Sequence, residues 1–565
     1  MLNQLKFENS FYLQKHKNDA ICWYPWSEKS LEKAKEENKS IFLSIGQSSS
    51  HWSTIMDKES FQKEPIIELL NERFIAIKVD ADEHPEIAKY YQRVHQLMNR
   101  STAGFPISIF MTENLEPFYA ASYIATEAQK ELLGFEELLR VISKKYITDN
   151  ETLSQKGHEV LQYINPKEQK IEATKLDINI LKTIKNQANH LFDNENGGFG
   201  KESKFPNIST LELILDSYEL TQDVSLLNMV TQSLDAMTTG GLHDKKNGGF
   251  YNYTTDSQWE KPNMVKTLYT NALLSQLYLR TYYLTVNKEY RDTALETIEF
   301  MITHLFNNNQ LFYSRVYDTD KIDKNILMSW NSMAISALFQ ASTLDKKYQS
   351  IAIKSLDALF KNLSINEELF HSTLSTNTPT TEAFLEDYAY LGELLINAYQ
   401  TTLDELYLVE ATKISNKMIE QFYVHGKWKF SNGKFTIDED IHDSNYASSL
   451  SIALSFLMSI SSLVDANYKK FVFKTLELNS YNLMRQPLTS PKLTTILLRY
   501  LKDDIVIKSN EELLTEHLNN RYSLGYPFIL FKTTLDEKIE LYNSNSCFAI
   551  ERTFNNIKPL IKSRR

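Results

Sequence analysis

The chain has 565 residues, a net charge of −11 at neutral pH, 42% apolar residues and 12% aromatic residues. This composition is typical of a folded protein and excludes an intrinsically disordered one. The negative charge argues against general nucleic-acid binding. The sequence has two cysteines, Cys22 and Cys547, which excludes a disulfide framework and a cysteine-rich zinc site.

The longest apolar stretch, residues 450–464, is interrupted by serines and is too short to cross a bilayer. The first residues have no apolar core of signal-peptide length. The histidines are scattered, without the spacing of a metal site. We therefore expect a cytoplasmic protein with no membrane partner, no bound metal and no cofactor.

The first 150 residues alternate between strand and helix patterns, which predicts a sheet covered by helices, an α/β domain. Pro106 stands just ahead of one strand, where a proline is tolerated and where a cis peptide bond can form. The expected strands span residues 41–45, 74–79, 107–111 and 118–123. The expected helices span residues 28–37, 55–70, 85–98 and 128–145.

The remainder of the chain has a different pattern. Residues 151–172 are polar and charged, which is typical of a linker. In residues 173–510 apolar residues recur at helical spacing, and glycine-rich loops such as Gly248-Gly249-Phe250 separate the helices. Helix pairs joined by such loops predict an α/α toroid whose loops gather at one mouth. Residues 511–565 return to mixed structure, with strands expected at 523–531 and 538–542, and could belong to either part.

The stretch Ser50-His51-Trp52-Ser53 lies at a turn between a strand and a helix, where many folds mount chemistry. Cysteines at positions 50 and 53 would make a redox pair, but serines cannot form a disulfide. Ser50 is either a nucleophile assisted by His51 or the N-cap of the helix, a role that contributes about 1 kcal/mol. The cap is favoured, since no carboxylate is evident that would orient the His51 ring. We expect Trp52 to pack against Pro106 and Cys22 to be a buried, inert thiol.

The first part of the chain resembles the thioredoxin-like domain of the family typified by spermatogenesis-associated protein 20. This resemblance is carried by Trp23-Tyr24-Pro25-Trp26, His51-Trp52, Lys78-Val79-Asp80 and Gly104-Phe105-Pro106. The second part resembles that family's α/α barrel, through Gly197-Gly198-Phe199-Gly200, Lys204-Phe205-Pro206 and Ser329-Trp330-Asn331. The resemblance implies a thioredoxin-like domain followed by an (α/α)6 toroid of the six-hairpin glycosidase type.

The chain departs from the family's pattern where chemistry would be expected. The family's Cys-His-Trp-Cys turn is here Ser50-His51-Trp52-Ser53, and a Pro-His-Phe-Glu-Lys stretch of its barrel is here Pro262-Asn263-Met264-Val265-Lys266. The Asp that usually follows Leu-Tyr is Thr270. Titratable groups are therefore missing from both places. This indicates a degenerate member of the family and argues against thiol–disulfide exchange.

The expected mouth of the toroid combines aromatic rings with polar side chains, as a pocket for a polyhydroxylated ligand requires. The candidate pocket residues are Lys204, Tyr253, Trp259, Lys266, Tyr269, Asn271, Trp330, Asn331 and Tyr388. Alternatively, Asp387 and Asn331 hydrogen-bond the backbone of the loops while Trp330 and Tyr388 fill the inner wall.

Three carboxylates, Asp256, Glu386 and Asp387, are candidates for catalysis, since glycoside hydrolysis needs a pair about 5–10 Å apart. Glu386 and Asp387 point in different directions on a helix, so Asp256 would have to partner one of them. The sequence leaves three functions open. The protein either binds a polar or sugar-like molecule in the toroid or acts as a scaffold, without redox chemistry. It could instead be an active carbohydrate isomerase, epimerase or hydrolase, or bind a protein partner at the thioredoxin-like face around Trp52 and Pro106.

Overall fold

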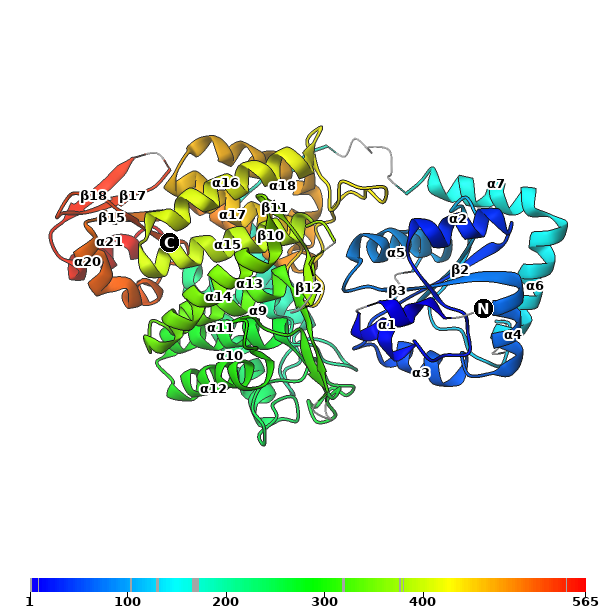
Figure 1. The fold of residues 1–565 in the computed structure, drawn as a ribbon. Helices are drawn as coiled ribbons and strands as arrows, with labels where there is room; N and C mark the ends of the chain where they lie inside the picture. The colour runs from blue at the N-terminus through cyan, green and yellow to red at the C-terminus, as the bar shows by residue number, and fades with distance from the viewer. Residues whose placement is uncertain are drawn as a thin grey trace. The chain divides into compact units, whose positions relative to one another are not determined.

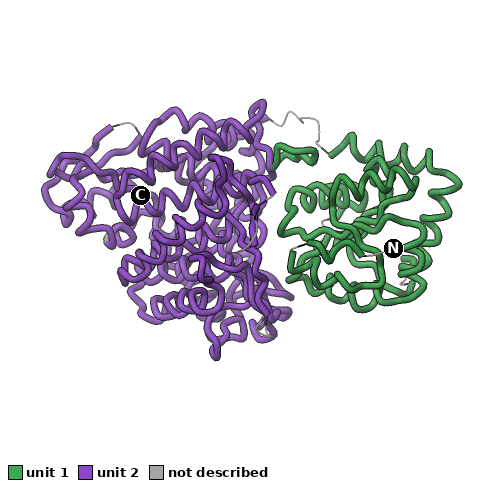
Figure 2. The backbone as a smooth tube through the Cα atoms, in the orientation of Figure 1, with its two compact units in different colours: residues 1–170, 431–438 green, residues 171–430, 439–565 purple. Residues whose placement is uncertain are grey.

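The computed structural model describes residues 3–8, 10–101, 104–128, 132–164, 172–317, 321–374, 378–379, 381–544 and 546–565. The chain forms two compact units, one of residues 1–170 and 431–438 and one of residues 171–430 and 439–565 (Figures 1 and 2). Each unit has a hydrophobic core of its own.

The first unit is built around a five-stranded sheet with the order β1-β3-β2-β4-β5. β2 (Ser40–Gly46) runs parallel to β3 (Phe74–Asp80) and antiparallel to β4 (Ile107–Met111). β5 (Pro117–Ala121) pairs with β4, and the short β1 (Tyr24–Pro25) pairs with β3. The strands predicted from the sequence are thereby confirmed, with small differences at their ends.

Helices cover both faces of this sheet, so its central strands are buried on both sides. Phe42 and Phe110 contribute to one core cluster, whereas Leu43 and Ile109 contribute to the other. The helices of the unit are α1 (Phe11–Lys15), α2 (Glu28–Glu36), α3 (His51–Glu59), α4 (Glu64–Arg73), α5 (Pro85–Asn99), α6 (Phe135–Thr148) and α7 (Asn150–Leu161), preceded by the 3-10 turn η1 (Gln4–Phe7).

Two helix predictions in this unit are wrong in their bounds. The single helix expected at 55–70 is two helices, because Pro65 fits the first turn of α4 but could not continue α3. The helix expected to begin at residue 128 begins at Phe135, after Gly134 at the N-cap position.

The linker predicted at residues 151–172 is also corrected, because its first part forms α7. Leu153 is buried, and Gly157 lets the helix approach Glu116 closely, since a Cβ at Gly157 would lie 2.7 Å from the Glu116 backbone. Polar composition alone did not reveal this packing. Residues 165–171 of the predicted linker lie outside the described residues.

Residues 431–438 complete the first unit although they are far along the chain. Phe435 packs against Trp26, Tyr90 and Tyr91, with ring centroids 5.2, 5.1 and 6.1 Å apart. The predicted boundaries assigned this segment to the toroid and are corrected here. A sequence pattern of helices cannot show that one intervening loop packs into another core.

The described part of the second unit contains a closed ring of six inner helices, each paired with an outer helix. The inner helices are α9 (Ile208–Thr221), α11 (Leu268–Thr285), α13 (Met328–Ala341), α15 (Leu385–Thr402), α17 (Ser449–Leu463) and α19 (Pro491–Lys502). The outer helices are α8 (Ile180–Leu191), α10 (Val224–Thr239), α12 (Lys288–Phe300), α14 (Lys347–Leu363), α16 (Glu405–Phe422) and α18 (Lys469–Arg485). Each inner helix packs against the next, and α19 packs against α9 to close the ring. The predicted (α/α)6 toroid is thereby confirmed.

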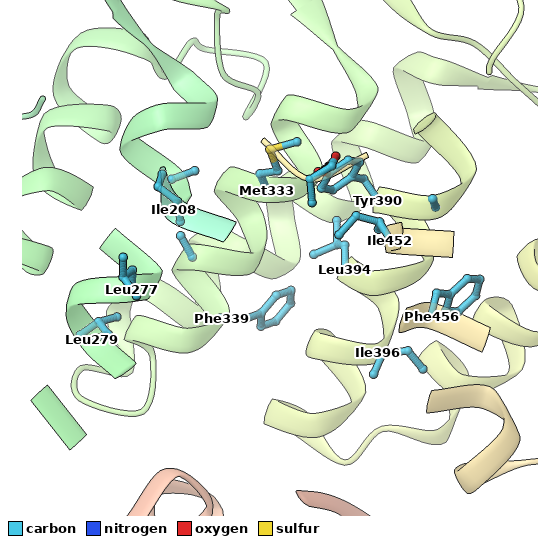
Figure 3. Close-up of a cluster of buried hydrophobic side chains, with 14 of the residues drawn as sticks. Ile208, Leu277, Leu279, Met333, Phe339, Tyr390, Leu394, Ile396, Ile452 and Phe456 are labelled. Atoms are coloured by element: carbon cyan, nitrogen blue, oxygen red, sulfur yellow. Dashed lines mark hydrogen bonds between the residues drawn. The ribbon is translucent and has the colours of Figure 1, made fainter. Parts of the chain in front are cut away.

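The two sets of helices differ in how they are buried. The inner helix α13 is buried along almost its whole length, whereas the outer helix α14 buries one stripe. Figure 3 shows Leu394 of α15 with Ile452 and Phe456 of α17 in the core of the ring. Within the described residues no helix is both long enough and apolar enough to cross a membrane.

Short strands, which the sequence did not indicate, lie in the connections of the toroid. They are β6 (Val265–Thr267), β7 (Arg315–Tyr317), β8 (Ile322–Asp323), β9 (Asn325–Leu327), β10 (Ser364–Ile365), β11 (Glu368–Leu369), β12 (Ser372–Leu374), β13 (Tyr423–Val424) and β14 (Lys427–Trp428). The π-helical turn η2 (Met301–Leu305) and the 3-10 turns η3 (Ala466–Tyr468) and η4 (Pro487–Thr489) also lie there.

The C-terminal segment belongs to the toroid unit, which decides between the two alternatives left open by the sequence. Its sheet has the order β16-β15-β17-β18. The Gln400 side chain of α15 donates to the Phe531 carbonyl at 2.8 Å and accepts from the Phe531 N–H. The elements are β15 (Ile505–Ser509), α20 (Glu511–His517), η5 (Leu518–Ser523), β16 (Ile529–Thr533), β17 (Ile539–Tyr542), β18 (Cys547–Glu551) and α21 (Phe554–Lys562).

The close contact between α15 and α17 gives a first testable prediction. A Cβ at Gly392 would lie 2.3–2.6 Å from three atoms of the Phe456 ring. Because overpacking a core costs about 1–3 kcal/mol, Gly392→Ala should lower the melting temperature measured by calorimetry. Gly433→Ala is the matched control, since nothing lies within 4 Å of its Cβ position. Equal melting temperatures for both variants and the parent would contradict this packing.

Candidate functional site

Ser50 at the former redox turn is a helix cap. Its hydroxyl oxygen accepts from the Ser53 N–H at 3.2 Å and its proton is donated to the Phe105 carbonyl at 2.8 Å, beside the cis Phe105–Pro106 bond. The predicted capping role is confirmed. Because the Ser50 hydroxyl already donates to a carbonyl, the geometry gives no support to a serine nucleophile activated by His51.

Trp52 does not fill the interior of this turn. Its side chain is 53% exposed, and its ring lies 5.1 Å from the ring of Tyr123 and beside His51. Trp52 is therefore largely exposed and lies beside Tyr123, while the packing against Pro106 stays a prediction. The cysteines Cys22 and Cys547 are each partly buried and do not form a disulfide with one another.

Two glycine-rich loops of the toroid are each stabilised by a buried lysine that bonds an aspartate and a glycine carbonyl of the loop. Lys204 donates to Asp193 at 2.6 Å and to the Gly197 carbonyl, and Lys266 donates to Asp244 at 2.6 Å and to a glycine carbonyl of its own loop. Burial acts to raise the pKa of Asp193, but hydrogen bonds from Lys204 and backbone N–H groups lower it to about 2. Both lysines are buried, so their predicted place in a ligand pocket is corrected to a structural one.

Asn271 and Asn331 also hold loops. The Asn271 amide accepts from the Phe250 N–H at 2.7 Å and donates to the Phe250 carbonyl. Asn331 does the same with Phe312, at 2.8 and 3.0 Å. Both amides are fully buried, so the backbone-bonding interpretation holds for Asn331, and the predicted place of Asn271 in a ligand pocket is corrected to a structural one.

The predicted aromatic pocket residues likewise lie in packed positions. Trp259 is buried and donates from its indole N–H to the Asn196 carbonyl at 3.1 Å. Tyr253 stacks on Phe205 with centroids 4.7 Å apart. Tyr388 is buried against Phe422 at 5.5 Å. These rings therefore pack against neighbouring groups of the toroid.

Two of the three candidate carboxylates already accept hydrogen bonds from other groups of the protein. Asp256 accepts from the backbone N–H groups of Gln258, Glu260 and Lys261 in an exposed turn. Asp387 is fully buried and bonds the His371 ring at 2.9 Å and the Phe384 N–H at 2.8 Å. Neither is placed to meet a substrate, so the proposed pairing of these carboxylates is not supported.

Glu386 lies in an aromatic cluster at the start of the inner helices. Its carboxylate accepts from the Ser329 hydroxyl at 2.7 Å and from the Tyr446 hydroxyl at 3.2 Å. The Tyr446 ring lies 5.0 Å from Tyr269, which in turn lies 4.7 Å from Trp330. Tyr446, which the sequence did not single out, therefore occupies the space between rings predicted to hold a ligand.

A small pocket remains beside this cluster. It has a volume of about 200 Å³ and is lined by residues of the loop before α9, by Asn252 and Thr270, and by Ser444 and Asn445. The Asn252 amide oxygen accepts from the Thr270 hydroxyl at 2.6 Å and from the Tyr269 hydroxyl at 3.0 Å. Its polar groups are therefore largely paired with one another.

The main polar space of the toroid lies along its axis, deeper than the predicted mouth. Two cavities of about 220 and 180 Å³ share the side chains of Glu212, Arg280, Asn397, Arg521 and Tyr522. Together they are lined by residues of all six inner helices. The polar residues among them are Glu212, Asp216, Glu219, Gln276, Arg280, Ser336, Gln340, Glu393, Asn397, Gln400, Thr401, Ser455, Ser459, Lys492, Thr495 and Arg499.

Ion pairs organise one side of this lumen. Arg280 of α11 donates to Asp216 at 2.5 Å and to Glu219 at 2.7 Å, both on α9. Thr495 of α19 donates to the second oxygen of Asp216 at 2.9 Å. Burial raises the pKa of Glu219, although the Arg280 charge opposes this. Ion pairs thus join α9 to α11, and the hydrogen bond from Thr495 joins α19 to the same group.

The other side of the lumen has groups that are less fully paired. One carboxylate oxygen of Glu393 is buried and has no hydrogen-bond partner within the described ranges. Lys492 lies 3.4 Å from Glu212, and the charges of Glu212 and Glu393 raise its pKa although burial acts to lower it. A buried carboxylate oxygen without a partner is costly, so this position is the best candidate for contact with a ligand.

The sequence contained a signal for this lumen. Glu212, Asp216 and Glu219 recur at spacings of four and three residues in an otherwise apolar helix, as do Glu393, Asn397 and Gln400. Such a stripe of polar residues occupies one face of a helix. Six helices with such stripes, arranged in a ring, place them around one axis.

These features define a class of protein: a thioredoxin-like domain without its redox pair, followed by an (α/α)6 toroid with a charged lumen. Residues 2–165 match the family model Thioredox_DsbH, described as "Protein of unknown function, DUF255". The chain is 34% identical to spermatogenesis-associated protein 20 of Mus musculus over 323 residues, and 34% identical to uncharacterized protein B0495.5 of Caenorhabditis elegans over 294 residues. The resemblance to the family typified by spermatogenesis-associated protein 20 is thereby confirmed.

These alignments cover 55% and 51% of this chain but 40% of each relative. The chain therefore spans about two fifths of the length of the curated relatives it matches. Among solved structures, the chain is similar to a cellobiose 2-epimerase from Bacillus thermoamylovorans B4167 (16% identity, TM-score 0.46, 54% of this chain and 85% of that one). A D-mannose isomerase matches at 12% identity and a TM-score of 0.46, over 58% of this chain and 98% of that one.

The loop that brings Tyr446 into the cluster gives a pH-dependent prediction. Asp443 accepts from the N–H groups of Ser448 and Lys492 at 2.9 and 2.7 Å. Burial nevertheless raises its pKa to about 6. Between about pH 4 and 6 the folded protein therefore binds more protons than the unfolded chain, and stability should fall by roughly 2–3 kcal/mol as the pH rises through this range.

Asp443→Asn should remove this fall, because the amide does not titrate. Urea unfolding of the parent and the variant at several pH values isolates the effect as their difference. Parallel profiles would contradict a raised pKa at Asp443.

Proposed function

We propose that this protein binds a small polar, polyhydroxylated molecule in the lumen of its toroid and carries out no redox chemistry. The observation that carries the proposal is the Glu393 carboxylate oxygen, buried and without a hydrogen-bond partner in the described part of the chain, on the wall of a polar cavity. A ligand hydroxyl donating to this oxygen would satisfy it.

The remainder of the lining suits such a ligand. A hydroxyl group both donates and accepts, so a polyol is best recognised by alternating donors and acceptors. Gln276, Gln340 and Asn397 provide amides to the lining, Arg280 provides a donor, and Glu212 provides an acceptor. The cavity volumes of about 220 and 180 Å³ lie below the usual range of drug-sized pockets, about 300–1,000 Å³, which favours a ligand of small-metabolite size.

The thioredoxin-like unit supports the absence of redox chemistry in this proposal. Thiol–disulfide exchange requires a thiolate, and the turn presents the hydroxyls of Ser50 and Ser53 in its place. Ser50 is engaged as a cap and Ser53 is buried, so the turn has a structural use.

A second candidate is a carbohydrate-modifying enzyme. The observation that favours it is Glu386, a carboxylate bonded to Ser329 and Tyr446 beside the small pocket at the start of the inner helices. In this proposal the sugar would displace Tyr446, and Glu386 would act as the acid or base. A protein partner at the face around Trp52 and Pro106 also stays a proposal, motivated by the exposure of Trp52.

The lumen proposal predicts a ligand-dependent thermal shift that depends on Glu393. Saturation with a ligand at a hundredfold excess over Kd stabilises the native state by about 2.7 kcal/mol, so a matching sugar or polyol should raise the melting temperature. Glu393→Gln replaces the unpartnered acceptor with an amide and should abolish most of this rise. The measurement is a thermal-shift screen of sugars, sugar phosphates and polyols on the intact chain.

Glu420→Gln is the matched control, since Glu420 is exposed on the outer helix α16 and should leave the shift unchanged. A shift that is equal in parent, Glu393→Gln and control would place the ligand outside the lumen. A shift lost in Glu386→Gln but kept in Glu393→Gln would favour the enzyme proposal instead.

The non-redox part makes a separate prediction. The protein should not accelerate the reduction of insulin by dithiothreitol, because neither serine of the turn supplies a thiolate. The double variant Ser50→Cys, Ser53→Cys tests whether the scaffold still supports the reaction, and we expect it to gain measurable activity. Catalytic reduction by the parent protein would overturn the proposal.

A further inference from the structure

Arg521 is a cation of the lumen whose partners are neutral. It lies in η5, and its side chain lines both cavities. Its guanidinium donates to the Gln400 amide oxygen at 3.0 Å and to the Tyr522 hydroxyl at 2.6 Å. Within the described residues no ion pair joins it to a carboxylate. A guanidinium has five N–H donors, so Arg521 can donate to a further acceptor.

The other cations that line the lumen differ from Arg521, because each of them has a carboxylate partner. Arg499 donates to the two oxygens of Asp504 at 2.5 and 2.8 Å. Burial raises the pKa of Glu219, although the charges of Arg280 and Arg565 both oppose this. The remaining pairs are Arg280 with Asp216 and Glu219, and Lys492 with Glu212.

The neutral contacts of Arg521 fix its side chain in place. Gln400, which accepts one of its hydrogen bonds, is itself bonded to the backbone of Phe531. The Tyr522 ring stacks on Tyr283 of α11 with centroids 5.1 Å apart, and the guanidinium lies 4.7 Å from the Tyr522 ring centroid. A guanidinium held in this way loses little side-chain entropy when it forms further hydrogen bonds.

Glu393 and Arg521 therefore have complementary requirements for a ligand. The buried Glu393 oxygen has no partner in the described part of the chain and needs a donor, while Arg521 has no anionic partner there. Both residues line the larger cavity, and no ion pair joins them within the described ranges. A neutral sugar would satisfy Glu393 alone. A molecule that carries both a hydroxyl and an oxyanion would satisfy both groups.

We propose that the ligand of the lumen is an acidic polyol, in which a hydroxyl donates to Glu393 and a carboxylate or phosphate group accepts from Arg521. This inference rests on the lumen proposal, which by itself allows a neutral sugar. Arginine binds carboxylate and phosphate groups through parallel N–H···O bonds, which add geometric specificity. Arg521 is therefore the residue that selects acidic ligands over neutral ones.

Titration calorimetry of the intact protein tests this selectivity with two matched sets of probes at constant ionic strength. One set is sorbitol and gluconate, and the other is glucose, glucuronate and glucose 6-phosphate. Within each set the probes differ mainly in the acidic group, and the second set distinguishes a carboxylate from a phosphate. Because a hydrogen bond to a charged group contributes more than a neutral one, we expect an acidic probe to bind at least about tenfold tighter than its neutral partner.

Arg521→Gln should remove this preference, so that the acidic probe binds no tighter than the neutral one. Lys538→Gln is the matched control, because it removes one positive charge from an exposed position in the same C-terminal segment and should leave the preference unchanged. Arg521→Lys keeps the test decisive if Arg521→Gln does not fold. It retains the charge but loses the planar fork, so the preference should fall severalfold.

Equal binding of acidic and neutral probes, weakened in both cases by Glu393→Gln, would contradict this inference and leave the lumen proposal standing. A preference for acidic probes that persists in Arg521→Gln and Arg521→Lys would also overturn it, since the oxyanion would then bind elsewhere. Absence of binding of every probe at millimolar concentration would overturn it as well. The thermal-shift screen then decides the lumen proposal separately.

Discussion

The toroid depends on charge balance inside its ring of helices. Arg280 bridges Asp216 and Glu219 across two neighbouring inner helices, and Thr495 ties the last inner helix to the same Asp216. An unpaired buried charge costs several kcal/mol, so the inner helices must adopt a register that brings these groups together. The polar stripe that closes the ring is also the wall of its cavity. The same residues therefore stabilise the ring of helices and line the candidate site. Glu393 differs, because one of its buried carboxylate oxygens has no hydrogen-bond partner in the described part of the chain.

The loops at the start of the inner helices illustrate the opposite case. Asn271, Asn331, Lys204 and Lys266 are buried, and they bond the backbone of glycine- and phenylalanine-containing loops. Polar residues gathered at the mouth of a toroid resemble a ligand site, but here their hydrogen bonds are made to backbone groups of the protein. The polar groups at the mouth already have partners within the protein, whereas the lumen contains a buried carboxylate oxygen without one in the described part of the chain. The lumen is therefore the better candidate site.

The sequence predicted the architecture well and the site poorly, for physical reasons. The apolar runs of β2, β3 and β4 and the helical spacing of the inner helices are local patterns, and both were identified. The role of Asn331 depends on its bonds to Phe312, 19 residues away, and spacing does not encode such contacts. Glu393, Asn397 and Gln400 form a polar stripe that can be recognised in the sequence. Its place on a cavity wall could not be predicted, because that depends on six helices arranged in a ring that turns such stripes toward one axis.

The most direct test of the central claim is a crystal structure of the protein soaked with the sugar or polyol that gives the largest thermal shift. The account predicts electron density for the ligand in the lumen, within hydrogen-bond distance of the Glu393 carboxylate and the Arg280 guanidinium. Density at the mouth beside Asn252 and Glu386, with only water in the lumen, would contradict it and would assign the binding site to the start of the inner helices.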